Sequence, residues 1–108
     1  VRAVPGVGDV SYRIGYSNSG FGHHMGAIEI EWMSGGAAVR QVLFHAMHDN
    51  PPVVLSRTAQ GLSVRMQFCM REEDTCRRWT ATYVYQPARR QFRPANATAR
   101  RLFAVGCQ

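Results

Sequence analysis

The sequence contains no lysine, although 13 of its 108 residues are basic. All 13 are arginine, against seven acidic residues, so the formal net charge is +6 and the isoelectric point is near 10. Guanidinium groups stay charged at any accessible pH and bind carboxylates and phosphates in a forked geometry. A domain with this charge is expected to attract acidic proteins, anionic glycans, lipid head groups or nucleic acid.

Long hydrophobic runs are also missing. No apolar segment approaches the roughly 18–20 residues of a membrane-crossing helix, so no transmembrane segment is predicted. With 45% hydrophobic residues the chain is too apolar for a disordered tail, and three cysteines are too few for a disulfide-dense mini-protein. A chain of this length fits one domain, which we expect to span residues 1–108.

Signatures of catalysis and of phosphate binding are lacking too. The glycine-containing segments 6–8 and 20–26 have no Walker lysine and precede no helical pattern. No nucleophile elbow brings serine, histidine and aspartate together, and no RNA-recognition, zinc-knuckle or cold-shock motif is present. We therefore expect a protein that is not an enzyme, holds no cofactor and does not bind nucleic acid.

The dominant pattern is an alternation of apolar and polar residues, which is typical of half-buried antiparallel strands. Turn signals rich in glycine, proline and asparagine separate the alternating segments. The sequence predicts an all-β domain, a single antiparallel meander of about 6–8 strands folded as a sandwich or a half-open barrel. At most one short helix is expected, near 96–102, and residues 102–107 alternate like a short closing strand. The clearest strands are 10–16, 28–32, 62–68 and 79–85; residues 39–47 (which also fit a helix), 53–57 and 90–93 are further candidates.

The segment 62–85 predicts a hairpin with a defined register. If Cys69 faces Cys76, all apolar pairs fall on one face and all polar pairs on the other, whereas a slip of one residue would mix the two faces. Two cysteines directly opposite each other can form a disulfide, which we predict between Cys69 and Cys76. The apolar pairs are Met66–Trp79, Val64–Ala81 and Leu62–Tyr83; the polar pairs are Gln67–Arg78, Arg65–Thr80 and Ser63–Thr82.

Cysteine usage favours an oxidising compartment. The third cysteine, Cys107, is a free thiol, a dimer bridge or a competitor for one of the hairpin cysteines. The sequence begins at Val1 without a methionine and without a charged-then-apolar leader, as expected either for a mature bacterial protein whose signal peptide has been removed or for a trimmed chain. We expect a periplasmic or secreted protein.

Four histidines are the candidate metal ligands: His23, His24, His45 and His48. Their spacing is poor, because adjacent residues and residues three apart point to different faces of a strand. No bound metal is therefore expected. A glycosylation sequon, Asn96-Ala97-Thr98, matters only in a eukaryotic secretory setting.

Eight of the 13 arginines lie in the last 38 residues, together with five aromatic residues. The alternation places the strand aromatics on the core face, where they are not free to stack on bases. The best hypothesis is a small exported protein-binding domain, an inhibitor or immunity protein that blocks a secreted cell-wall-type hydrolase with an acidic active-site mouth. The alternative is an arginine-driven binding module for an anionic envelope polymer or lipid head group. The candidate contact residues are Arg71, Glu72, Glu73, Arg77 and Arg78 around one loop and Arg89, Arg90 and Arg93 around the next.

Overall fold

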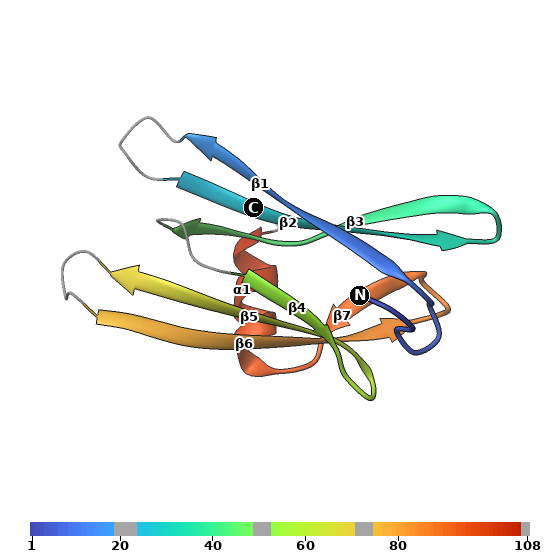
Figure 1. Ribbon diagram of the computed structural model, residues 1–108. Helices are drawn as coiled ribbons and strands as arrows, with labels where there is room; N and C mark the ends of the chain where they lie inside the picture. Colours follow the sequence, from blue (N-terminus) through green and yellow to red (C-terminus); the bar gives the residue numbers. More distant parts are fainter. Residues whose placement is uncertain (19–23, 49–52, 71–74, 107–108) are drawn as a thin grey trace.

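The computed structural model describes residues 1–18, 24–48, 53–70 and 75–106 (Figure 1). These residues form two antiparallel sheets and one helix, which confirms the predicted all-β class. Within the described ranges, no helix has the length and apolar character needed to cross a membrane. Sheet I consists of β1 (Val10–Asn18), β2 (His24–Ser34) and β3 (Ala37–His48), in that order. Sheet II consists of β4 (Val53–Arg57), β5 (Gly61–Met70), β6 (Thr75–Gln86) and β7 (Gln91–Pro94), and α1 (Ala97–Gly106) follows.

The two sheets form the layers of a sandwich, and α1 stands between them, against β3 and β6 (Figure 1). Apolar side chains from both sheets and from α1 fill the space between the layers, as expected when each strand hides one of its faces. The buried core comprises Val4, Val10, Ile28, Ile30, Trp32, Leu43, Leu55, Leu62, Val64, Ala81, Tyr83, Phe92 and Ala99.

The register of β5 and β6 is the one predicted from the alternation. Val64 lies opposite Ala81, and Leu62 lies opposite Tyr83. These four side chains are buried, so the apolar pairs do face the core. The same register places Cys69 opposite Cys76. The backbone pairing on which the disulfide prediction depends is therefore confirmed, while the bond itself stays a prediction.

Sheet I contains a β-bulge that the sequence pattern did not indicate. Ile28 pairs with Phe44 and Glu29 with Val42, so Leu43 is the extra residue on β3. A bulge re-aims the side chains next to it. The extra residue, Leu43, is part of the core, and its side chain is 1% exposed.

Two expectations from the alternation are wrong. In the predicted strand 10–16 the alternation groups Tyr12 with Val10 on the core face, but Tyr12 is 40% exposed, because β1 is an edge strand with a neighbour on one side only. The closing strand expected at 102–107 is absent, because α1 extends through Gly106. An alternation over only six residues is compatible with a helix as well as with a strand, and Asn96 favours the helix. Its Oδ1 atom accepts a hydrogen bond from the Ala99 amide at 2.9 Å, which caps a helix that begins at residue 97.

The Asn96 side chain also extends the pairing of β6. Strand β7 is short and pairs only with the end of β6, from Tyr83 to Gln86. Beyond it, Asn96 Nδ2 donates to the Thr80 carbonyl at 2.8 Å and Asn96 Oδ1 accepts from the Thr82 amide at 3.2 Å. One side-chain amide thus replaces a peptide group at the strand edge. The asparagine of the sequon is engaged in the fold through both ends of its amide.

Aromatic side chains join the two sheets beside β7. The Trp32 ring, from sheet I, makes edge contacts with Phe92 and Tyr85, from sheet II, at centroid distances of 5.3 and 6.0 Å. Perpendicular ring pairs of this kind are favourable beyond their buried area. They explain why Phe92 is fully buried even though it belongs to a strand of only four residues.

Candidate functional site

Charge is divided unequally between the two halves of the chain. Residues 1–52, which include sheet I, hold three arginines and four acidic residues, for a net charge of −1. Residues 53–108, which include sheet II and α1, hold ten arginines and three acidic residues, for a net charge of +7. The three acidic residues of this second half, residues 72–74, lie outside the described part of the chain. The positive charge of the protein therefore belongs to sheet II and α1.

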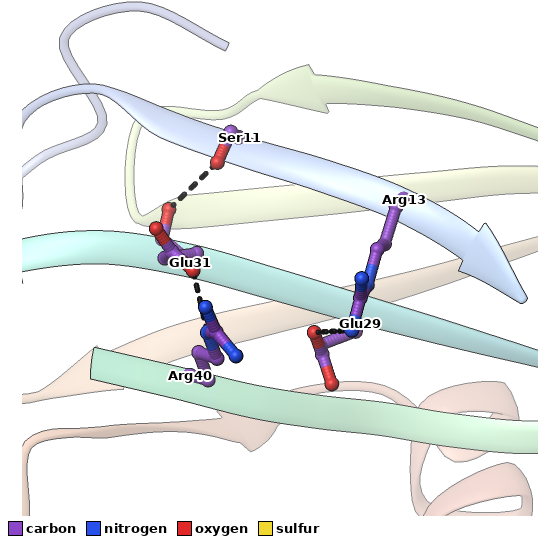
Figure 2. A network of polar contacts seen from close by, with 5 residues as sticks. All are labelled: Ser11, Arg13, Glu29, Glu31 and Arg40. Carbon is purple, nitrogen blue, oxygen red and sulfur yellow. Dashed lines mark hydrogen bonds and ion pairs between the residues drawn. The ribbon is translucent and has the colours of Figure 1, made fainter. Parts of the chain in front are cut away.

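The charges on the outer face of sheet I neutralise one another (Figure 2). Arg13 Nη2 lies 2.8 Å from Glu29 Oε1, and Arg40 Nε lies 2.6 Å from Glu31 Oε2. The hydrogen bond and the charge of Glu31 raise the pKa of Arg40 above its usual value. Ser11 Oγ donates to the Glu31 carbonyl at 3.4 Å and completes the network.

The surface above this network offers little room for a ligand. The depression lined by these charged side chains has a volume of about 120 Å³. Small-molecule sites usually enclose about 300–1,000 Å³. We therefore regard the surface between Arg13, Glu29 and Arg40 as a set of mutually paired charges rather than as a small-molecule site.

Sheet II differs from sheet I in its charges. None of the sequences of β4, β5, β6, β7 and α1 contains an acidic residue. The alternation places Arg65, opposite Thr80, on the side of the sheet away from the core, and Arg78 lies on the same side, two residues before Thr80 on β6. Cross-strand diagonal neighbours lie about 7–8 Å apart. We define the arginine face as the exposed outer side chains Val54, Arg65, Arg78 and Thr80.

Next to the arginine face, hydroxyl groups line the middle of sheet II. Ser56 and Ser63 are cross-strand partners, and their Oγ atoms are 2.9 Å apart, within hydrogen-bond distance. Both side chains are at least partly buried. Sheet I and α1 lie on the other side of sheet II (Figure 1). The outer side is therefore polar and basic, and the described elements leave it open.

The structure separates the two groups of predicted contact residues. Arg77 and Arg78 lie near the start of β6, and Arg89 follows its other end, in the turn to β7 (Figure 1). The eight residue steps from Arg78 to Gln86 correspond to about 26 Å of strand. The two predicted groups therefore lie at opposite ends of β6, and which of them contacts a partner stays a prediction. Arg71, Glu72 and Glu73 lie outside the described residues.

The turn after β6 is closed by a backbone hydrogen bond. The Arg89 amide donates to the Gln86 carbonyl at 3.2 Å, which closes a turn with Pro87 in its second position. Arg89 and Arg90 are exposed at this turn, and Arg93 is half-buried in β7 opposite Val84. The turn therefore adds a second basic surface, at the end of sheet II remote from Arg78.

The aromatic side chains near these arginines are engaged in the fold. Tyr83 and Phe92 are buried, as the alternation predicted. The Arg101 guanidinium lies 4.6 Å from the ring centroid of Trp79, a cation–π contact that ties α1 to β6. Among the described residues, Tyr83 Oη has no hydrogen-bond partner, and burial raises the pKa of this tyrosine above its usual value.

The candidate histidines are arranged differently from what their spacing suggested. His24, the first residue of β2, lies directly opposite His48, the last residue of β3. His45 lies opposite Ala27, and His23 lies outside the described residues. In the described part of the chain, no group of three or more metal-ligating residues occurs. The His24–His48 pairing could have been found only by fixing the β2–β3 register first, since the residues are far apart in sequence.

The chain matches no protein-family model, no curated protein and no solved structure at a significant level. Function is therefore inferred from the arrangement of its own residues. Two features remain after the paired charges of sheet I are set aside. They are the arginine face of sheet II and the histidine pair at the end of sheet I.

Proposed function

We propose that this chain is a binding domain and that its arginine face binds an acidic surface of a partner protein. The observation that carries the proposal is the division of charge. The arginines of sheet I are paired with glutamates, whereas no acidic residue occurs in any element of sheet II or in α1. Guanidinium groups whose own sheet contains no carboxylate gain most from a partner that supplies carboxylates, and they speed its approach.

The described carboxylates support a binding role rather than a catalytic one, because each is held by another residue of the fold. The three described carboxylates, those of Asp9, Glu29 and Glu31, each have a structural partner. Asp9 Oδ1 accepts from the Ala3 amide at 3.0 Å, and the two glutamates hold Arg13 and Arg40. A general acid or base must be free to exchange a proton with a substrate. None of the three is placed for that role.

The specific role we propose is that of an inhibitor or immunity protein that blocks a secreted cell-wall-type hydrolase. Such a protein works outside the cytoplasm, where a Cys69–Cys76 disulfide would persist and stabilise the hairpin. Its target would be acidic around the active site, because a basic enzyme would be repelled. The proposed location is the periplasm or the extracellular space.

A second candidate is a module that binds an anionic envelope polymer or a lipid head group. It is favoured by the separation of the basic surfaces, since Arg78 and Arg89 lie at opposite ends of β6. A ligand that touches both must extend over about 26 Å. An anionic polymer can do so, and its binding would depend steeply on salt.

Two double variants with the same net charge test the arginine face. Arg65→Gln/Arg78→Gln removes two charges from sheet II, and Arg13→Gln/Arg40→Gln removes two charges from sheet I. The immobilised protein and both variants are incubated with envelope and secreted fractions of the source organism, washed at low and high salt, and the retained component is purified for titration. We expect one protein, retained near one-to-one after the high-salt wash, whose affinity falls at least about tenfold with the sheet II variant only.

Three results would count against this proposal. Equal weakening by both variants would show that net charge, and not the arginine face, determines binding. Unchanged affinity in the sheet II variant would place the contact elsewhere. Retention of polymers or lipids alone, released by high salt, would favour the second candidate.

A further inference from the structure

Strand β1 has a free edge. It pairs with β2 on one side, and no described strand lies on its other side (Figure 1). Val1 covers only the beginning of that side. The Val10 amide donates to the Val1 carbonyl, and the Val1 amine donates to the Val10 carbonyl, both at 2.8 Å. The polar backbone groups of Val10 therefore point away from β2.

The same direction recurs along the rest of β1. Backbone groups of an antiparallel strand point to its two sides alternately, residue by residue. The pairing of β1 with β2 runs without a bulge from Val10 to Asn18. The N–H and C=O groups of Tyr12, Ile14, Tyr16 and Asn18 therefore also point away from β2. Each of these residues offers one donor and one acceptor to an additional strand.

The core is incomplete beside this edge. Tyr12 lies opposite Ile30 on the core side of sheet I, but Ile30 is 0% exposed whereas Tyr12 is 40% exposed. A neighbouring strand would remove part of this apolar ring from water, which is favourable. Exposed edges are commonly protected by proline or by free charges. β1 contains no proline, and its one charged residue, Arg13, is held by Glu29.

We propose that a second copy of this chain binds along β1, with the two β1 strands antiparallel around a two-fold axis. In such a pairing, residue i contacts residue j and j contacts i. One register uses every free residue: Tyr12 pairs with Asn18 of the second copy, and Ile14 pairs with Tyr16. Gly15 then lies opposite Gly15 on the axis. This is a closely spaced pair, where glycine allows two backbones to approach.

Charge and packing favour β1 over the other strand edges. The backbone of β7 is held by Gln41 through Phe92, and β3 packs against α1. Pairing through β4 would bring together two halves of net charge +7, whereas residues 1–52 have a net charge of −1. The proposed register also places Arg13 opposite Ser17 of the second copy, so the two Arg13 residues are not opposite each other. Like charges directly opposite would be destabilising.

The pairing sets the orientation of the two arginine faces. A two-fold axis between antiparallel strands is perpendicular to the sheet, so both copies of sheet II lie on the same side of the joined sheet I. Both arginine faces then point in one direction, as a bivalent binder requires. The pairing itself does not depend on the proposed function, since no residue of sheet II takes part in it.

Sedimentation velocity of the 108-residue protein at increasing concentration tests the proposal, with a dimer as the expected end point. Two variants test the register. Ser17→Glu places a carboxylate opposite Arg13 of the second copy, and Ser17→Arg places a like charge there. Each change occurs twice in the dimer. We expect the dissociation constant to fall about 2- to 30-fold with Ser17→Glu and to rise by a similar factor with Ser17→Arg.

The matched controls are Ser11→Glu and Ser11→Arg, which make the same charge changes at an exposed position outside the paired segment. They should leave the dissociation constant within about twofold. Thermal melts check that every variant folds, and Ser17→Asp and Ser17→Lys replace any that melts early. Equal effects at positions 11 and 17 would overturn the proposed register. A monomer at concentrations up to about 1 mM would overturn the dimer.

Residue-resolved amide hydrogen exchange of the wild type gives a second readout that needs no variant. The amides of Tyr12, Ile14 and Tyr16 should exchange more slowly as concentration rises, because they gain hydrogen bonds only in the dimer. The amides of Ser11 and Arg13 point toward β2 and should be protected at every concentration. A dimer in which the first three amides showed no added protection would associate through another surface, and the proposal would be wrong.

Discussion

Gln41 and Phe92 exchange two hydrogen bonds across the sandwich. Gln41 Nε2 donates to the Phe92 carbonyl and Gln41 Oε1 accepts from the Phe92 amide, both at 2.8 Å. The glutamine side chain therefore pairs with the backbone of β7 as a neighbouring strand would. Because Gln41 belongs to β3, this contact connects sheet I to the short outer strand of sheet II.

Gln41→Ala should therefore lower the free energy of unfolding by about 1–3 kcal/mol, since it leaves both backbone groups of Phe92 without a partner. Gln60→Ala, at an exposed loop position, is the matched control and should change stability by less than about 0.5 kcal/mol. Urea denaturation of both variants measures the difference. Equal midpoints would show that water replaces the glutamine without loss.

Asn96→Ala should also destabilise the protein, by about 1–3 kcal/mol, because it removes the cap of α1 and two hydrogen bonds at the edge of β6. Thr98→Ala removes the same glycosylation sequon but leaves these three bonds intact. Circular dichroism during urea denaturation compares the two. If Thr98→Ala lost as much stability as Asn96→Ala, the account of Asn96 would be wrong.

Alkaline pH should destabilise the protein through Tyr83. Its side chain is 1% exposed, and burial raises its pKa in the folded state above the unfolded value of about 10. The contribution of Tyr83 to the free energy of unfolding is fully present below about pH 10. It falls as the pH rises further, because only the unfolded chain then releases the proton. Measuring unfolding free energy at several pH values from 8 to 11 shows the decline.

The matched comparison is Tyr83→Phe. Because Tyr83 Oη has no hydrogen-bond partner among the described residues, its removal should be neutral or slightly stabilising near pH 7. The same variant should flatten the alkaline decline. A loss of more than about 1 kcal/mol at pH 7 would instead reveal a partner for the hydroxyl group.

The register of β5 and β6 leads to a prediction about the thiols. If Cys69 and Cys76 are joined, labelling of the denatured, non-reduced protein should modify one cysteine of three, and Cys107→Ser should leave none. Reduction should then cost about 2–3 kcal/mol of stability, from the entropy of an eight-residue ring. Intact-mass measurement gives the count. Three labelled thiols would contradict both the disulfide and the proposed compartment.

The alternation of residue types was sufficient to predict the strands and the pairing of β5 with β6, because a slip of one residue would expose Leu62 or Val64. It could not predict which residues meet across longer distances. The Gln41–Phe92 contact depends on how the two sheets pack, and the His24–His48 pair depends on the register after the bulge at Leu43. The distance between the two groups of arginines likewise depends on the fold, since a 12-residue strand carries the chain between Arg77 and Arg89.

The unequal division of charge gives the molecule a permanent electric dipole, with its positive pole on sheet II. In the field of an acidic partner the domain would rotate before contact and present sheet II first. Fewer encounters would then occur in an unproductive orientation. The charges of sheet I contribute to this effect because they cancel one another. Since sheet I has no excess positive charge, the partner's field attracts only the sheet II side of the domain, and the domain has one preferred orientation.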